Sequence, residues 1–209
     1  MKRKITMKQK SLDQAAMEPL LDSVAVLRGK RSGHALSDGE EALRHYSIVA
    51  AMLDPKGPHG LGNEPLKAFF DTVSPGAREY ILQENDCVVE NEYSIRDRQM
   101  TVVIRNRIFC VAVEIDLTSS NPARLKATEE WLIRRPEAHK ILFYLTWPGN
   151  FTNDPTLLQD GYFAISFRRD IRDWIMKCSL AAWEKNYSSV HEFCHRYCSC
   201  LQETMHYPY

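Results

Sequence analysis

Apolar and polar residues in the first third of the chain alternate with the period of helices. Apolar positions within residues 11–29 fall three and four apart on one helical face, and a polar, glycine-bearing loop follows. Ser37 and Glu40 then form a capping-box pair, which predicts a helix over residues 38–53. The Asp-Pro-Lys-Gly-Pro stretch that follows ends this helix, because proline cannot continue it. A further helix is expected over residues 63–73.

The pattern changes to that of β-strands in the middle of the chain. Residues 87–95, 100–104 and 108–117 are rich in β-branched and aromatic residues, as strands are. The last of these runs is almost continuously apolar, which indicates a central strand buried on both faces. Residues 105–107 are short enough to be the turn of a hairpin.

Helices and strands alternate in the remainder of the chain. The pattern predicts a helix over 122–135, strands over 140–146 and 162–167, and helices over 170–184 and 188–204. Antiparallel strands followed by a strand–helix–strand crossover predict an α/β fold with a mixed sheet of about five strands between helices.

Composition narrows the class of protein. The 209 residues are 44% hydrophobic and 26% charged, which is typical of a globular protein with a core. No run approaches the ~20 apolar residues of a membrane span, and no apolar segment follows the basic N-terminus as in a secretory signal. We therefore expect a cytoplasmic protein without membrane contact. The six cysteines do not have the spacing of a disulfide framework and are expected to be reduced.

Charge gives weak guidance on partners. The 27 basic and 27 acidic residues cancel, whereas proteins dedicated to duplex binding usually carry a basic surplus. Residues 1–10 are interpreted as a flexible basic start, which could contact phosphates but is more typical of a solvated tail. A second basic patch could be formed by Arg168, Arg169 and Arg172. We divide the chain into a basic segment and helix (1–36) and a main domain (37–209).

One arrangement of strand residues is suited to chemistry on nucleic acids. Metal-dependent cleavage of a phosphodiester needs two or three carboxylates aimed at one point, with a cation or base beside them. A sheet can supply one acid from its second strand, and an acid and a lysine two residues apart from its third. The strand period of two places both members of that pair on one face.

Three stretches of this sequence, in order, carry a family resemblance. Residues 45–70 contain an apolar helix followed by Leu-Asp-Pro-Lys-Gly-Pro-His-Gly, residues 141–149 contain Tyr-Leu-Thr-Trp-Pro-Gly, and residues 165–174 read Ile-Ser-Phe-Arg-Arg-Asp-Ile-Arg-Asp-Trp. They resemble a bacterial stand-alone family of PD-(D/E)XK nucleases over about residues 41–202. The resemblance implies a restriction-endonuclease-like fold, and its motif positions include His45, Asp54 and His59.

The positions that the resemblance implies for catalysis carry different residues here. The acid of the second strand falls at Thr101, and the glutamate–lysine pair of the third strand falls at Glu114 and Asp116. The glutamine of the next helix falls at Arg124, and the glutamate of the first helix at Ala42, although Glu41 is adjacent. Four of the five functional positions therefore depart from the family pattern.

These departures favour loss of catalysis. Threonine lacks the charge that a hard cation draws from its ligands. Glu114 and Asp116 place two negative charges on one face without the lysine, so either Mg²⁺ neutralises them or one acid takes up a proton or turns to solvent. Retained activity would need a cation from the next helix, Lys126 or Arg124, and a replacement acid from among Glu90, Glu92 and Asp97.

Histidines and cysteines suggest two further sites. His45 and His59 could flank an active-site entrance, but we expect them to hydrogen-bond and hold the Asp-Pro-Lys-Gly loop. In the last helix, His191, Cys194, His195 and Cys198 have the spacing of one helical face, with Cys200 beyond, and could bind zinc. Buried cysteines serving as core residues are the preferred interpretation. The four tryptophans are expected to be core or helix-packing residues and not base-stacking platforms.

The sequence thus predicts a pseudo-nuclease, an inactive PD-(D/E)XK scaffold used as a binding or regulatory module. Its ligand would be nucleic acid, a nucleotide signal or another protein, and fold-level association suggests a role in bacterial or phage defence. One alternative is an active, divergent Mg²⁺-dependent nuclease that cleaves DNA or RNA with Glu114, Asp116 and a migrated lysine. A second is a protein inhibitor or partner of a toxin or defence enzyme.

Overall fold

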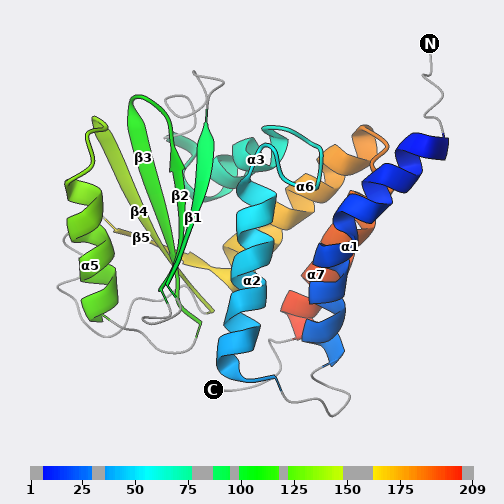
Figure 1. Ribbon diagram of the computed structural model, residues 1–209, viewed down its shortest axis with the longest axis horizontal. Helices are drawn as coiled ribbons and strands as arrows, with labels where there is room; N and C mark the ends of the chain where they lie inside the picture. Colours follow the sequence, from blue (N-terminus) through cyan, green and yellow to red (C-terminus); the bar gives the residue numbers. More distant parts are fainter. Residues whose placement is uncertain are drawn as a thin grey trace.

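The computed structural model describes residues 7–29, 36–76, 87–94, 99–117, 122–147 and 162–203. Within these residues the chain forms an α/β structure with one five-stranded sheet (Figure 1). The elements, in chain order, are α1 (Met7–Gly29), α2 (Asp38–Leu53), α3 (Glu64–Val73), β1 (Val88–Ser94), β2 (Gln99–Arg105), β3 (Phe109–Ile115), α5 (Pro122–Ile133), β4 (His139–Thr146), β5 (Tyr162–Ser166), the π-helix η3 (Phe167–Ile171), α6 (Arg172–Glu184) and α7 (Ser188–Glu203).

The sheet is mixed, with the strands in the spatial order β1-β2-β3-β4-β5. The first three strands are antiparallel neighbours, and β3, β4 and β5 run parallel to one another. Helix α5 forms the crossover between β3 and β4, as a parallel connection requires. The mixed sheet and the hairpin between β2 and β3 confirm the architecture expected from the strand and helix pattern.

The two faces of the sheet are covered unequally. On one face a small apolar cluster joins β2, β3 and β4 to α5 through Leu125 and Leu132. On the other face a much larger core joins the sheet to α2, α3, α6 and α7, and α1 contributes to it from outside. Among the described elements, Figure 1 shows α5 on one side of the sheet, with α1 and α7 farthest away on the other side. Every residue of β3 is buried, as its continuous apolar run predicted.

Local signals in the sequence are confirmed at both ends of α2. The Ser37 hydroxyl accepts a hydrogen bond from the Glu40 amide, and the Glu40 carboxylate accepts one from the Ser37 amide. After α2, the turn is built on Asp54, whose carboxylate accepts from the Lys56 amide and whose carbonyl accepts from the Gly57 amide. This turn leads the chain from α2 to the start of α3.

Two local expectations were wrong. Helix α1 begins at Met7, so the last four residues of the supposed flexible start are helical. The chain does not enter α6 directly from β5, because a π-helix intervenes, with its first amides bonded to the Ser166 hydroxyl. The tryptophans agree with expectation, since Trp147 and Trp174 are buried and Trp183, although 68% exposed, places its ring 5.2 Å from that of His191 on α7.

Two further features concern the environment of the chain. All six cysteines lie in described segments, and none is in a disulfide, as their spacing predicted. No helix in the described part of the chain has both the length and the apolar composition that crossing a bilayer demands.

The turn after α2 leaves no room for a side chain at Gly57. A Cβ there would overlap the Ala51 carbonyl oxygen and would lie 2.9 Å from that of Asp54. We expect Gly57→Ala to lower the free energy of unfolding by about 1–3 kcal/mol, measured by urea unfolding, since the backbone must shift. Gly39→Ala is the matched control. Its Cβ would meet open space inside α2, so a gain of about 0.5–1 kcal/mol is expected. Equal stabilities of the two variants would contradict this account.

Candidate functional site

The candidate site is built on three neighbouring strands. Thr101 on β2 pairs with Glu114 on β3 in antiparallel register, and Glu114 pairs with Tyr144 on β4 in parallel register. Residues paired in this way share a face of the sheet. Thr101, Glu114 and Tyr144 are all buried, beneath helix α5.

Both carboxylate oxygens of Glu114 are hydrogen-bonded. Oε1 accepts from the guanidinium of Arg124, and Oε2 accepts from the hydroxyls of Thr101 and, at 3.1 Å, Thr128. A second guanidinium nitrogen of Arg124 donates to the carbonyl of Ile115 at 2.7 Å. Burial raises the pKa of the Glu114 carboxyl, against the opposing charge of Arg124 and the hydrogen bonds, which lower it. Both oxygens of the Glu114 carboxylate therefore have hydrogen-bond partners inside a buried cluster.

The cation of this cluster is Arg124 and not the candidate lysine. Arg124, Leu125 and Thr128 lie on the face of α5 that covers the sheet, with Leu125 and Thr128 fully buried. Lys126 is two residues from Arg124, about 200° around the helix, and is exposed. The structure therefore brings Arg124 to Glu114 and does not bring Lys126 there.

Asp116 has a different environment from Glu114. It follows directly after β3, its amide donates to the Leu145 carbonyl at 2.9 Å, and its carboxylate accepts from the Tyr144 hydroxyl at 3.0 Å. Burial, and then the charge and hydrogen bond of Asp116, raise the pKa of the Tyr144 hydroxyl. Tyr144 is thus held protonated as a donor to Asp116.

The residues present are a poor match for Mg²⁺. A hard cation takes several carboxylate oxygens, but Glu114 gives its oxygens to a guanidinium and two hydroxyls. Thr101 supplies a hydroxyl where a carboxylate is needed, and Arg124 brings a fixed positive charge. Ala42 is buried in the core on the opposite face of the sheet and offers no carboxylate. The hydrogen bonds of Glu114 and Asp116 therefore do not support the hypothesis that these two carboxylates bind one metal ion.

Other acids considered as replacements lie elsewhere. Glu90 on β1 forms an ion pair with Arg105 on the neighbouring strand, which lowers the pKa of the Glu90 carboxyl. The backbone of Glu92 pairs with that of Thr101. Asp97 and the side chain of Glu92 lie outside the described residues.

His45 does not hold the Asp-Pro-Lys-Gly loop, contrary to expectation. It is buried, its Nδ1 lies 2.8 Å from the Tyr197 hydroxyl, and its ring packs edge-on against Trp147 and Phe167. The reason is helical geometry, since Asp54 is nine residues away, about 13 Å along α2. His45 instead links α2 to α7 and to the end of β4.

His59 does hold that loop, as expected. Its Nδ1 accepts a hydrogen bond from the Leu61 amide, so Nε2 carries the proton and donates to the Asp54 carbonyl at 2.9 Å. The ring is buried. Burial lowers the pKa of His59, although the hydrogen bond and charge of Asp54 raise it. A neutral imidazole with one donor and one acceptor is required at this position.

The cysteines and histidines of α7 separate onto different sides. Cys194, Cys198 and Cys200 are buried in the core, and burial raises the thiol pKa of Cys194 and Cys198, the latter to about 12. His195 is exposed and His191 is partly exposed. The described residues contain no group of three or more His, Cys, Asp or Glu side chains placed to hold a metal. Cysteines serving as core residues, the preferred interpretation, are confirmed.

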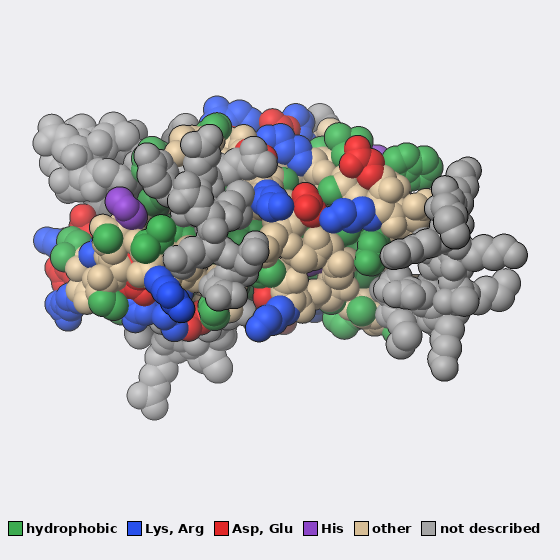
Figure 2. All heavy atoms as spheres, turned by 90° about the horizontal axis from the view of Figure 1, so that it is seen from above, with side chains coloured by type: hydrophobic (Ala, Val, Ile, Leu, Met, Phe, Trp, Pro, Cys, Tyr) green, Lys and Arg blue, Asp and Glu red, His purple; other side chains and the backbone are tan. Residues whose placement is uncertain are grey.

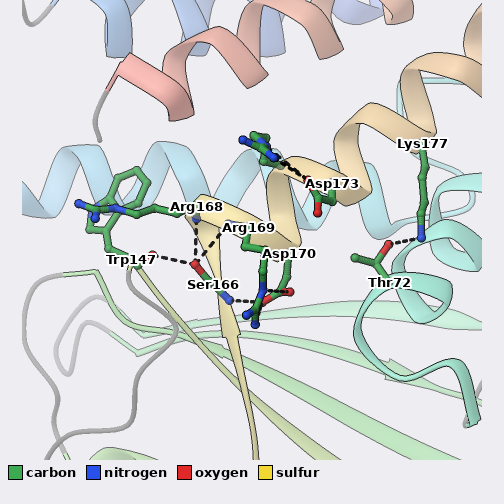
Figure 3. A network of polar contacts seen from close by, with 9 residues as sticks. Thr72, Trp147, Ser166, Arg168, Arg169, Asp170, Asp173 and Lys177 are labelled. Atoms are coloured by element: carbon green, nitrogen blue, oxygen red, sulfur yellow. Dashed lines mark hydrogen bonds and ion pairs between the residues drawn. The ribbon is translucent and has the colours of Figure 1, made fainter. Parts of the chain in front are cut away.

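The second basic patch is partly neutralised by its own carboxylates. Arg169 pairs with Asp170 and Arg172 pairs with Asp173. Figure 3 shows Ser166 bonded to the Trp147 carbonyl, with Arg169 turned toward Asp170 beside it. The Asp170 carboxylate also accepts from the Ser166 amide at 2.7 Å, so its negative charge lies at the start of the π-helix.

Two members of the site were not singled out from the sequence. Thr128 lies one helical turn after Arg124, and Tyr144 lies on the strand next to Glu114. The turn spacing from Arg124 was a usable signal for Thr128. Tyr144 lies in the Tyr-Leu-Thr motif, but its position opposite Glu114 could not be predicted, because it depends on the register of two strands separated by a helix.

Removal of the guanidinium tests the buried ion pair. Arg124→Met should lower the free energy of unfolding by about 3–5 kcal/mol near neutral pH, because the Glu114 charge loses its partner. The loss should shrink as the pH falls, because Glu114, whose pKa burial already raises, then takes up a proton. Urea unfolding across pH measures both effects. Lys126→Met, on the exposed side of α5, should change stability by less than about 0.5 kcal/mol. A loss in Arg124→Met that is independent of pH would argue against the pairing.

His59 should make stability depend on pH. The folded chain holds its pKa below the ordinary value, so below about pH 6.5 the unfolded chain binds a proton that the folded chain does not. The free energy of unfolding should therefore fall with decreasing pH, by up to about 1.4 kcal/mol per pH unit from this group. His59→Gln should lose this part of the slope, and His139→Ala, at an exposed position, should retain it. Identical slopes in all three proteins would refute the assignment.

The chain was compared with known proteins at three levels. Models of protein families, curated protein sequences and solved structures all give no match to it. The relation to PD-(D/E)XK nucleases therefore depends on the sequence motifs and on the geometry described above, and it stays a proposal.

Proposed function

We propose that this chain is a PD-(D/E)XK-like protein with a restriction-endonuclease-like fold that does not cleave nucleic acid and acts as a binding or regulatory module. The ordered motifs of the sequence support the family assignment. The mixed sheet supports it too, since an antiparallel β1-β2-β3 unit followed by the β3-α5-β4 crossover places Thr101 and Glu114 side by side. A role in bacterial or phage defence remains part of this proposal by fold-level association alone.

The hydrogen-bonded state of Glu114 is the observation that carries the proposal. Glu114 is the sole acid kept at the positions that the resemblance implies for catalysis, and its two oxygens accept from Arg124, Thr101 and Thr128. A divalent cation would have to displace the guanidinium, and breaking a buried ion pair costs about 3–5 kcal/mol. Arg124 thus takes the place of the metal as the partner of Glu114.

The distribution of charge favours a protein partner over a polyphosphate. The formal net charge of the chain is zero. On the face drawn in Figure 2, Lys and Arg side chains lie next to Asp and Glu side chains and form no broad surface of one sign. Arg105, Arg169 and Arg172 are each paired with a carboxylate. Cations that are already paired with carboxylates contribute little to the counterion release that drives binding to nucleic acids.

Incubation with nucleic acids and metal ions tests the loss of catalysis. The chain should leave single- and double-stranded DNA and RNA intact in Mg²⁺ or Mn²⁺, at the level of a Glu114→Gln variant purified identically. The physical reason is that no cation assembles at Glu114. Cleavage by the parent chain that is absent from Glu114→Gln would establish the divergent nuclease instead.

Binding measurements then distinguish the ligand. Fluorescence anisotropy with labelled oligonucleotides at several salt concentrations should give weak binding with a shallow dependence on salt, as expected for few phosphate contacts. A steep dependence without cleavage would identify a nucleic-acid reader and exclude the protein-partner form of the proposal.

A further inference from the structure

His191 and His195 form a pair on the outer side of α7. They lie one helical turn apart, their ring centroids are 4.5 Å apart, and the planes meet at 74°. Residues four apart on a helix present their side chains to the same point in solvent. Two histidines at this spacing are a known arrangement for binding a zinc ion, because both imidazoles can reach one cation. The spacing alone does not establish a site, so the hydrogen bonds of His191 are considered next.

The ring of His191 is held by Ser179 on helix α6. Its Nδ1 lies 2.8 Å from the Ser179 hydroxyl and 3.2 Å from the Ser179 carbonyl oxygen. A carbonyl can only accept, so this second contact is a hydrogen bond in the tautomer with the proton on Nδ1, in which Nε2 keeps its lone pair. Histidines that bind metals typically donate their other ring N–H to a carbonyl in this way, which orients the ring and raises its basicity. Ser179 is buried, so this hydrogen bond is held by the junction of α6 and α7.

The thiols of the same helix are excluded from the pair. Cys194 and Cys198 are buried in the core, and their raised thiol pKa values disfavour the thiolate that a metal needs. The pair therefore differs from the four-ligand zinc site considered from the sequence. Imidazole nitrogens without thiolates suit Zn²⁺, Cu²⁺ and Ni²⁺ and disfavour the hard cations Mg²⁺ and Ca²⁺.

We propose that His191 and His195 bind one divalent late transition-metal cation, Zn²⁺ or Cu²⁺, at the junction of α6 and α7. His191 contributes Nε2, and water completes the coordination sphere, so the cation keeps open positions for an outside ligand. This site lies on α7, and the proposed loss of catalysis at Glu114 is independent of it.

The fluorescence of Trp183 can report metal binding at this site. Its ring centroid lies 5.2 Å from that of His191, and its side chain is 68% exposed on α6. A paramagnetic Cu²⁺ ion bound by His191 would lie close to this indole and quench its fluorescence. Trp183→Phe removes the reporter while leaving both imidazoles in place. The other three tryptophans supply an internal reference, since they are buried or half-buried elsewhere.

Titration with CuCl₂ and ZnCl₂ tests the proposal on the full chain. Isothermal calorimetry should give one saturable site, Cu²⁺ should quench tryptophan fluorescence, and Zn²⁺ should compete with that quenching. Cu²⁺ should bind more tightly than Zn²⁺. His195→Ala and His191→Ala should each weaken binding roughly tenfold or more. His139→Ala, at an exposed histidine outside the pair, should bind as the parent chain does.

Two further measurements separate binding at this pair from a loss of folding and from binding elsewhere on the chain. His195 is exposed, so His195→Ala should keep the melting temperature of the metal-free parent chain while losing the rise that Zn²⁺ produces in it. Trp183→Phe should bind Cu²⁺ with parental affinity and lose the quenching. Parental affinity in the double variant His191→Ala/His195→Ala, or the same quenching in Trp183→Phe, would overturn the proposal.

Discussion

The buried ion pair between Glu114 and Arg124 is the constraint on which the organisation of the site depends. A carboxylate that is fully removed from water must have its charge compensated, or folding loses several kcal/mol. Arg124 compensates it from the first turn of α5, and the hydroxyls of Thr101 and Thr128 complete its hydrogen bonds. The pair consequently ties β2, β3 and α5 together at the C-terminal end of the central strand β3.

The pairing lies on the face of the sheet that α5 covers. The apolar cluster under α5 is small, whereas α2, α3, α6 and α7 bury a far larger core on the other face. Arg124 donates both to Glu114 and to the Ile115 carbonyl, so hydrogen bonds hold α5 to the sheet where the apolar contact is small. The same arrangement removes Glu114 from chemistry, because an acid already paired and hydrogen-bonded is a poor ligand for a cation.

Much of the fold could be predicted because its signals are local. The capping box of Ser37 and Glu40 placed the start of α2, and the apolar run of β3 identified the buried central strand. The π-helix after β5 could not be predicted in this way. At its start the Ser166 hydroxyl accepts from the amides of Arg168 and Arg169, and the Asp170 carboxylate accepts from the Ser166 amide.

The sequence by itself determined that Glu114 and Asp116 follow one another at strand spacing and that a cation would have to come from the helix beyond them. It left Arg124 and Lys126 as alternatives, because both are near enough along the chain. Tertiary structure selected Arg124, since the rotation of α5 about its axis is set by burial of Leu125 and Leu132 against the sheet. Which side chain faces a buried charge is thus decided by packing between elements, which no local pattern encodes.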